Sequence, residues 1–262
     1  MAERIWDRFL TEEDKEVFAV SGWGARAGYG KRPALVVVDV NYAFCGDRPE
    51  PILESIKRWR NSCGPYAWKA LPVIRSLIDA CRSKGLPVIY TTSGYREDGW
   101  DRGSWEWKNA RMGEDSSARQ KYNRNPSDIM DEIAPASQDI VIRKLKPSAF
   151  SGSPLKSYLT LLGADSIIVA GTTTSGCVRG TVIDAFSENL RVVVAEDGCF
   201  DRAVASHAIN LCDMHAKYAD VVPTSELIEY IASLPDGLFD LPKGDSRKTA
   251  EDPFPKQQRR AR

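Results

Sequence analysis

The residues around Cys177 have the types and spacing expected for a cysteine nucleophile. Residues 171–179 read Gly-Thr-Thr-Thr-Ser-Gly-Cys-Val-Arg and lie between an expected strand and an expected helix. This position places the thiol near a helix N-terminus, where the helix dipole favours a thiolate and backbone N–H groups can hold the oxyanion of a tetrahedral intermediate. The pattern favours nucleophilic attack on a carbonyl carbon. The ordinary alternative is a small buried cysteine without a chemical role.

Two charged residues are expected at strand ends, and the strand that ends at Asp39 is expected to be buried. Asp39 ends the apolar run 34–38, and Lys144 follows the run 139–143. A desolvated carboxylate at Asp39 would have a raised pKa and could accept a thiol proton. An ammonium at Lys144 could stabilise a thiolate or a developing oxyanion. From the residues alone, Asp39 can equally cap a loop, and Lys144 can be a solvated lysine beside other basic residues.

Elements far apart in the sequence must bring these three residues together. Short apolar runs rich in β-branched residues alternate with segments whose apolar residues recur three or four positions apart. The alternation predicts an α/β fold, with a doubly wound, mainly parallel six-stranded sheet in three layers and helices on both faces. Such folds place their sites beyond the C-terminal ends of the strands. The expected strands are 34–40, 87–92, 139–143, 166–171, 191–195 and 219–222, and the expected helices are 67–84, 153–162, 178–189, 203–217 and 224–234.

Three segments fall outside this alternation. We expect residues 1–30 to form an N-terminal arm, 31–236 to form one α/β domain and 237–262 to form a C-terminal tail. The arm contains a helix opened by Thr11, and its apolar residues need a surface on the core or on another subunit. Residues 95–125 combine charges, glycines and aromatic residues without a regular period, which is typical of a functional loop or lid.

Composition and charge argue against several classes of function. Lys plus Arg is 36 and Asp plus Glu is 36, so the formal net charge of zero gives no reason to expect a nucleic-acid partner. The 6 cysteines form no C-x-x-C pair, which favours reduced thiols in a cytoplasm. No apolar run approaches the roughly 18 residues of a membrane span, and the N-terminus has no apolar signal core. We expect a soluble cytoplasmic protein without a membrane partner.

Taken together, the motifs resemble the isochorismatase-like cysteine hydrolases, most closely their N-carbamoylsarcosine amidohydrolase branch. The resemblance runs from about residue 28 to about residue 234. Its parts are Gly-Tyr-Gly-Lys-Arg-Pro-Ala at 28–34 leading to Asp39, Tyr-Thr-Thr at 90–92 with Tyr-Arg at 95–96, Val-Ile-Arg-Lys at 141–144 with Ser-Ala-Phe at 148–150, and Ser-Gly-Cys-Val-Arg at 175–179. Each part alone is weak, but the combination is specific.

The resemblance implies a catalytic triad of Asp39, Lys144 and Cys177. It also implies a covalent thioester-type intermediate, which water releases after ammonia has left. A cis peptide bond is implied between Thr172 and Thr173, with the N–H groups of Thr173 and Cys177 as the oxyanion hole. A homo-oligomer, by family resemblance a tetramer, is a further implication.

Four side chains are candidates for substrate binding. Arg202 matches an arginine near the site of the carbamoylsarcosine branch, and its planar guanidinium suits a substrate carboxylate. The alternative for Arg202 is a surface arginine beside a helix-start aspartate. Arg96, Trp105 and Trp107 are expected to close over the substrate, although core packing explains tryptophans at least as well.

We expect no metal and no cofactor. Nicotinamidases of this superfamily bind a metal through an aspartate and several histidines beside the triad. This chain has 2 histidines, His207 and His215, both beyond the nucleophile in one expected helix. They lie too far apart for a metal pair at positions i and i+4.

The sequence therefore predicts an enzyme that hydrolyses carbon–nitrogen bonds other than peptide bonds, in small linear amides. N-carbamoylsarcosine or a related ureido acid is the expected prototype substrate. Maleamate amidohydrolase is the nearest alternative, since pocket shape sets that choice. A catalytically silent interaction protein is the alternative of another class. A nucleotide-binding module is not favoured, because the glycine-rich phosphate-binding motifs are absent from the sequence.

Overall fold

The part of the chain that this computed structural model describes, residues 4–108 and 124–244, is built around a six-stranded sheet. The strands are β1 (Pro33–Val38), β2 (Val88–Ser93), β3 (Ile140–Lys144), β4 (Ser166–Thr172), β5 (Arg191–Phe200) and β6 (Asp220–Val222). Their order is β3-β2-β1-β4-β5-β6, and each neighbouring pair is parallel. The predicted α/β sheet is confirmed, with β1 and β4 at its centre.

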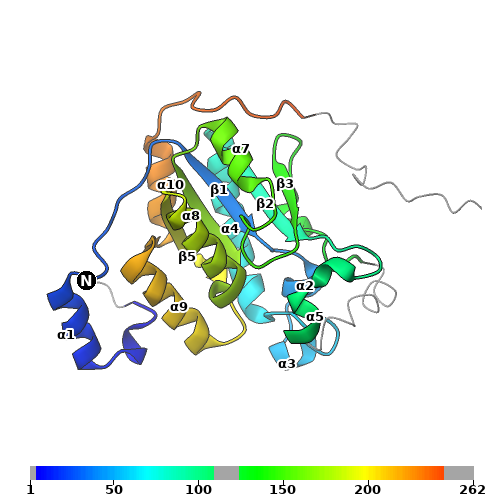
Figure 1. The fold of residues 1–262 in the computed structure, drawn as a ribbon, viewed down its shortest axis with the longest axis horizontal. Helices are drawn as coiled ribbons and strands as arrows, with labels where there is room; N and C mark the ends of the chain where they lie inside the picture. Colours follow the sequence, from blue (N-terminus) through cyan, green and yellow to red (C-terminus); the bar gives the residue numbers. More distant parts are fainter. Residues whose placement is uncertain (1–3, 109–123, 245–262) are drawn as a thin grey trace, which may run out of the picture.

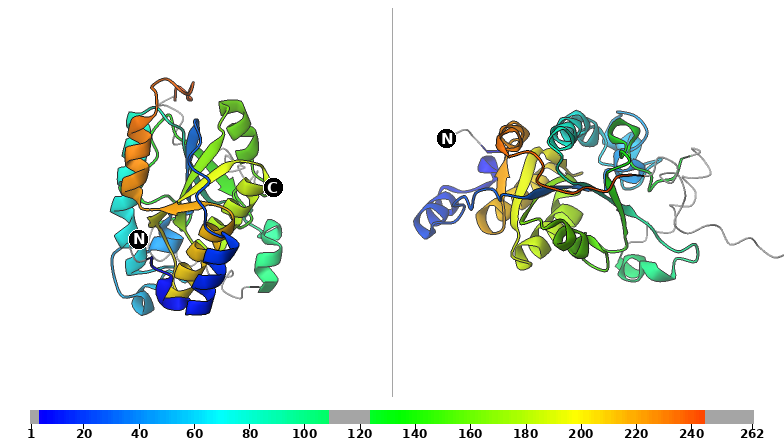
Figure 2. Two further views of the ribbon diagram at one scale, coloured as in Figure 1. Left: turned by 90° about the vertical axis from the view of Figure 1, so that its left-hand side faces the viewer. Right: turned by 90° about the horizontal axis from the view of Figure 1, so that it is seen from above.

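Helices cover both faces of the sheet, as Figures 1 and 2 show. One face carries α4 (Pro65–Ser83) and α10 (Thr224–Ser233), and the other carries α7 (Leu155–Leu162), α8 (Arg179–Ser187) and α9 (Val204–Lys217). Successive strand residues point to opposite faces, which explains the two layers. In β1, Leu35 and Val37 pack with α4 and α10, whereas Ala34 and Val36 pack with the other three helices.

The other helices of the described residues lie outside these layers. They are η1 (Asp7–Phe9), α1 (Glu12–Ser21), α2 (Tyr42–Cys45), α3 (Ile52–Ser55), η2 (Trp100–Arg102), α5 (Ser104–Lys108), η4 (Asp131–Ile133) and η5 (Thr174–Val178). Most of them were not predicted, because helices of three to five residues are too short to show a period. Of the predicted lid and tail, residues 109–123 and 245–262 lie outside the described residues.

The predicted N-terminal helix is α1, which projects from the body of the domain in Figure 2. Thr11 and Asp14 form a capping box at its start. Phe18 is partly packed against the core, but Val20 and Trp23 are 82% and 52% exposed. The arm was expected to pack its apolar residues on the core or on another subunit. Val20 and Trp23 do not pack on the core of this chain.

The central strands approach each other closely at the edge where the site lies. Val38 pairs with Gly171, and a Cβ added at Gly171 would lie 2.2 Å from the Val38 carbonyl oxygen. Only glycine fits this approach, and its φ of +113° also disfavours any other residue. Asp39 leaves β1 with a φ of 52°, in the left-handed region that few non-glycine residues adopt. The residues that follow β1 and β4 are thereby brought to one edge of the sheet.

Several predicted strand bounds differ from the structure, and two of the differences bear on the site. Lys144 is the last residue of β3 rather than the residue after it. β5 runs past the predicted end at 195 to Phe200, which pairs with Thr172. Glu196 and Asp197 interrupt its apolar run, and the register shifts along the β4 edge, so the continuation was hidden in the sequence. Among the described residues, no helix is both long and apolar enough to cross a membrane.

Candidate active site

Asp39 and Lys144 form a buried ion pair at the C-terminal edge of the sheet. The Lys144 Nζ atom lies 2.7 Å from Asp39 Oδ2 and donates to the Lys146 carbonyl at 3.0 Å. The hydroxyl of Thr91, from β2, donates to Asp39 Oδ1 at 2.9 Å. Asp39 is 3% exposed and Lys144 is 5% exposed. The alternative of a solvated lysine is therefore wrong, and each charge requires the other to remain buried.

Cys177 lies beside this ion pair. Its side chain is buried, and the charges of both Asp39 and Lys144 act on its thiol. It belongs to η5, a π-helical turn that follows β4 and leads directly into α8. The Thr181 hydroxyl of α8 donates to the Cys177 carbonyl at 2.7 Å and accepts from Ala149 N at 3.0 Å. Three chain segments thus bring the predicted cysteine, carboxylate and ammonium together.

Burial and charge set the protonation state of the thiol. Burial, and after it the Asp39 carboxylate, raise the pKa of Cys177 to about 12, although Lys144 acts in the opposite direction. Burial and the Asp39 charge therefore shift the pKa of Cys177 in the direction opposite to the one predicted from the helix N-terminus. Desolvation together with a neighbouring negative charge outweighs the helix dipole.

The ammonium of Lys144 is stabilised by its neighbours. Burial lowers the pKa of Lys144, but the charge of Asp39, and after it the interaction with Cys177 when the thiol ionises, more than offset this, and the pKa rises to about 12. At neutral pH the site therefore contains a neutral thiol and a charged lysine. A thiol with so high a pKa needs a base at the moment of attack.

The backbone of residues 172–178 folds around the thiol. The peptide bond between Thr172 and Thr173 is cis. The Thr173 carbonyl accepts hydrogen bonds from Gly176 N at 2.9 Å and Val178 N at 3.2 Å. This closes a tight turn that contains both Thr173 and Cys177, whose N–H groups were predicted to form the oxyanion hole.

Arg202 lies beyond the end of β5, on the side of the site formed by the end of β4. Its guanidinium donates to the Asn61 carbonyl, and it lies 5.6 Å from the centre of the Phe44 ring. Its positive charge acts on Cys63, whose Sγ atom is 3.6 Å from the Thr172 hydroxyl. Arg202 is therefore near the end of β4, with its guanidinium half-buried rather than free on the surface.

The other three predicted substrate-binding residues lie in or near the 95–108 loop. The Trp105 indole N–H donates to the Leu145 carbonyl at 3.1 Å, so α5 docks beside Lys144. The side chain of Arg96 is 62% exposed and pairs with Asp98 at 2.7 Å, and Trp107 is 83% exposed. The structure ties Trp105 to the backbone of the residue that follows Lys144, whereas the side chains of Arg96 and Trp107 are exposed.

Each histidine has a partner within the fold. His207 Nδ1 shares a hydrogen bond of 2.8 Å with the Thr174 hydroxyl, and His215 Nδ1 accepts from Val221 N at 3.2 Å. Across residues 4–108 and 124–244, no three His, Cys, Asp or Glu side chains gather as a metal ion would require. The two histidines therefore serve different parts of the fold.

Sequence reasoning treated Asp201 only as a helix-start aspartate, whereas the structure makes it part of the site. Asp201 is 6% exposed, and its Oδ2 atom accepts from Ser175 N at 2.8 Å and from the Ser175 hydroxyl at 2.7 Å. Its Oδ1 atom accepts from Arg202 N at 2.7 Å. The signal that could have revealed it is a carboxylate directly after an apolar strand, at the same sheet edge as Asp39.

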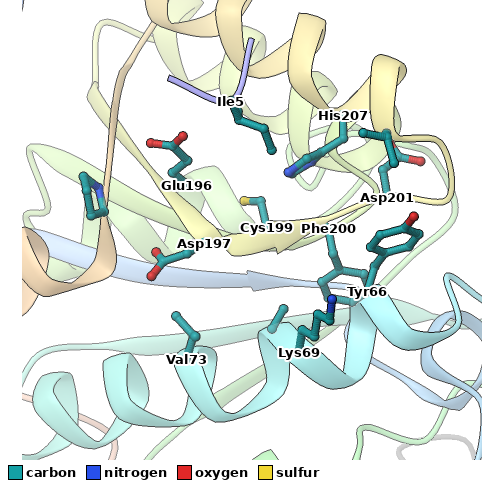
Figure 3. Close-up of a pocket in the computed structure, with 13 residues that line it drawn as sticks. Ile5, Tyr66, Lys69, Val73, Glu196, Asp197, Cys199, Phe200, Asp201 and His207 are labelled. Carbon is teal, nitrogen blue, oxygen red and sulfur yellow. The ribbon is translucent and has the colours of Figure 1, made fainter. Parts of the chain in front are cut away.

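A cavity of about 580 Å³ (Figure 3) lies beside Asp201 and His207, which hydrogen-bond to the turn at residues 173–178. Its walls come from α4, the end of β5 and the start of α9, and they include Lys69, Phe200, Asp201 and His207. The triad residues do not line this cavity. The cavity is therefore a separate space, joined to the turn through Asp201 and His207.

The domain is doubly wound, and its buried ionisable side chains meet at the C-terminal ends of the parallel strands. This is the architecture of an α/β enzyme. The family model of the isochorismatase domain matches residues 33–226. The chain therefore belongs to the isochorismatase family, which confirms the resemblance seen in the motifs.

Known relatives narrow this assignment. The N-carbamoylsarcosine amidase of Arthrobacter sp is 31% identical over 251 residues, which cover 93% of this chain and 86% of that protein. The maleamate amidohydrolase of Pseudomonas putida is 28% identical over 214 residues, covering 81% and 92%. The crystal structure of N-carbamoylsarcosine amidase from Thermoplasma acidophilum superposes with a TM-score of 0.57 at 28% identity, covering 74% of this chain and 96% of that one. The chain is an amidohydrolase of this family, which confirms the predicted class of carbon–nitrogen hydrolase.

Proposed function

We propose that this chain is a cysteine-dependent amidohydrolase that releases ammonia from a small carbamoyl or amide compound bearing a carboxylate. The observation that carries the proposal is the burial of Cys177 beside the Asp39–Lys144 ion pair, whose two charges act on the thiol. N-carbamoylsarcosine or a related ureido acid is the proposed substrate. The similarity to an N-carbamoylsarcosine amidase over 93% of the chain supports this choice.

The first half of the reaction transfers the acyl or carbamoyl group to the enzyme. The Cys177 sulfur bonds to the substrate carbonyl carbon while its proton passes to the Asp39 carboxylate. The N–H groups of Thr173 and Cys177 hold the oxyanion, and the Lys144 ammonium stabilises the negative charge nearby. The carbon–nitrogen bond then breaks, and the leaving nitrogen takes the proton from Asp39. Ammonia departs, and a thioester-type intermediate remains on Cys177.

The second half regenerates the enzyme. Water attacks the thioester-type carbon, and the Asp39 carboxylate accepts a proton from that water. When the carbon–sulfur bond breaks, the proton returns from Asp39 to the sulfur, and the acid product is released, a carboxylic acid from an amide or a carbamic acid from a ureido compound. The raised pKa of Cys177 fits this cycle, because a thiol that is neutral at rest requires a base for each attack.

Ammonia release from a panel of carbamoyl amino acids, ureas, maleamate and nicotinamide tests the proposal. We expect hydrolysis of one carboxylate-bearing member, unchanged after treatment with a chelator. Preference for maleamate over the carbamoyl amino acids would favour the second candidate function, which the 28% identity to a maleamate amidohydrolase supports. Absence of release from every compound would contradict the proposed substrate class.

Replacing Arg202 by glutamine is expected to raise KM for the carboxylate substrate by roughly 10- to 100-fold, because one charge-assisted hydrogen bond to the substrate is lost. The guanidinium lies close to the end of β4, where a substrate carboxylate could reach it. Steady-state kinetics on the acid and on its neutral methyl ester provide the measurement. The variant should leave KM for the ester nearly unchanged, and an equal rise for both compounds would contradict a carboxylate role.

We also propose that the enzyme works as a homo-oligomer in the cytoplasm, with the tetramer as the expected form. The exposed apolar residues Val20 and Trp23 on the projecting N-terminal arm support association with another copy. Light scattering on the purified chain measures the oligomeric state, and a stable monomer at micromolar concentration would contradict it.

A further inference from the structure

We propose that Asp201 and His207 are positioning residues that clamp the nucleophile turn, residues 173–178, from the side of the adjoining cavity. The inference rests on the proposed cysteine amidohydrolase function, and it assigns to these two residues a role in aligning the oxyanion hole. Neither residue contacts the Asp39–Lys144 pair in the hydrogen bonds or ion pairs of the described chain. They act through Thr174 and Ser175, which lie between Thr173 and Cys177.

The carboxylate of Asp201 is the stronger half of the clamp. One of its oxygens accepts from both the backbone N–H and the hydroxyl of Ser175, at 2.8 and 2.7 Å. The other accepts from the N–H of Arg202 at 2.7 Å. Hydrogen bonds to a charged acceptor are short and strong, and little water competes for them when the carboxylate is 6% exposed. A single buried carboxylate thus fixes the nucleophile turn relative to Arg202.

His207 holds the turn one residue earlier. Its Nδ1 atom is 2.8 Å from the Thr174 hydroxyl, and the ring is half-buried at the start of α9. Burial lowers the pKa of His207 and outweighs the Asp201 charge, which acts in the opposite direction. The lowered pKa favours a neutral ring at neutral pH. A neutral imidazole can pair with a hydroxyl as donor or as acceptor. Two successive residues of the turn are therefore tied to neighbouring parts of the β5–α9 connection.

The clamp matters because an oxyanion hole tolerates little displacement. Donors must lie within about 0.5 Å of the productive position, and loss of one donor costs roughly 100- to 1,000-fold in kcat. The two proposed donors, the N–H groups of Thr173 and Cys177, lie on either side of the clamped pair. Loosening Thr174 and Ser175 would shift these donors by amounts that an oxyanion hole does not tolerate, while the Cys177 thiol stays close enough to its ion-pair partners to react with a small alkylating reagent.

The cavity makes this idea testable without disturbing the triad. Figure 3 shows Asp201 and His207 on one wall, and Lys69, which comes from α4, on the facing wall. Substitutions at Asp201 or His207 therefore border on open space rather than on close-packed core. Lys69 supplies a matched control, because Lys69→Met alters the same cavity without touching the turn.

The decisive variant is Asp201→Asn, which keeps the shape but replaces one acceptor oxygen by an N–H donor group. We expect kcat to fall about 10- to 100-fold, a partial loss of the oxyanion-hole effect. The rate at which iodoacetamide alkylates Cys177 should stay within about threefold of the wild-type rate, since alkylation of a thiol needs no oxyanion hole. Hydrogen exchange of the peptide covering 173–178 should become faster, and Lys69→Met should change none of the three measurements.

His207 provides a rescue test. His207→Leu is expected to lower kcat roughly threefold to tenfold, through loss of one neutral hydrogen bond. His207→Asn can place its amide near the former Nδ1 position and should recover most of that loss. Equal losses in both variants would show a packing role and would overturn the assignment of His207.

Failure of the clamp and failure of the proposed function give different results. If the wild type hydrolyses a panel compound but Asp201→Asn keeps full kcat, the clamp is refuted. It is also refuted if kcat and the alkylation rate of Asp201→Asn fall together with its melting temperature. If the wild type hydrolyses nothing, the proposed function fails, and hydrogen exchange alone decides the clamp. Faster exchange confined to residues 173–178 would support it, and unchanged exchange would refute it.

Discussion

Replacing Cys177 by serine is expected to lower ammonia release by roughly 10,000-fold or more, the loss typical for removal of a nucleophile. The serine hydroxyl is nearly isosteric, so the ion pair between Asp39 and Lys144 should persist. A hydroxyl is a far weaker nucleophile than a thiol, and this site has no histidine beside Cys177 among its described contacts to activate it. The effect should appear in kcat, measured with the best compound of the panel.

Two controls make the result specific. Cys212→Ser, in α9, changes another buried cysteine that has no contact with Asp39 or Lys144 among the described interactions. It should retain wild-type kcat and lose only some stability. Mass spectrometry of the wild type, quenched during turnover, should find the acyl or carbamoyl adduct on Cys177. Substantial activity in Cys177→Ser would contradict covalent catalysis, and an inert thiol together with a silent panel would favour a non-enzymatic interaction protein.

The placement of the triad could be predicted from the sequence because strand ends are readable. The apolar runs before Asp39 and Lys144 are short, β-branched and bounded by polar residues, which identifies strands of a parallel sheet, β1 in its buried centre and β3 at its edge. In a parallel sheet the C-terminal ends of strands share one edge, so three residues far apart in sequence were expected at one site. The structure adds the close approach at Gly171 and the left-handed backbone of Asp39, which no periodicity reveals.

The electrostatics of the thiol could not be predicted in the same way. The helix N-terminus is visible in the sequence, and by itself it predicts a lowered pKa for Cys177. The opposing effects are the depth of burial and the distance from Asp39 to the sulfur, and both depend on tertiary packing. A local rule therefore gave the wrong direction, because two non-local contributions were larger.

Loop residues were the least predictable. The composition of residues 95–125 indicated function, but it could not distinguish Trp105, which docks beside Lys144, from the exposed Trp107. Asp201 went unrecognised because β5 continues through Glu196 and Asp197, and that polar interruption displaced the expected strand end. Both cases show that side-chain direction in irregular segments depends on contacts made by distant residues.

Replacing Asp39 by asparagine is expected to have opposite effects on two reactions of Cys177. Hydrolysis should fall by roughly 100- to 10,000-fold, the range for loss of a general base. Alkylation by iodoacetamide at pH 8 should become faster, because the Asp39 charge raises the pKa of Cys177 and Lys144 lowers it. Each unit by which the pKa falls gives tenfold more thiolate, and the weaker nucleophilicity of a less basic thiolate leaves a net gain of roughly threefold.

The pH profile of alkylation is the direct measurement. With a pKa of about 12 for Cys177, the wild-type rate should rise with pH through pH 10 without a plateau. In Asp39→Asn the whole curve should shift to lower pH. Lys144→Met is the matched control with the opposite charge change, and its curve should shift to higher pH. Circular dichroism on both variants checks the fold, since each leaves one buried group without its partner.

The direction of these shifts separates two roles for Asp39. In the first role, the Asp39 charge opposes thiolate formation at rest, and Asp39 accepts the proton only during attack on the amide. The Asp39→Asn variant is then alkylated faster and hydrolyses its substrate more slowly. Slower alkylation in Asp39→Asn would mean that Asp39 already draws the proton from Cys177 in the free enzyme. Cys177 would then be a thiolate and Asp39 a protonated acid before substrate binds. In that case the raised pKa of Cys177 that burial and charge imply would be wrong.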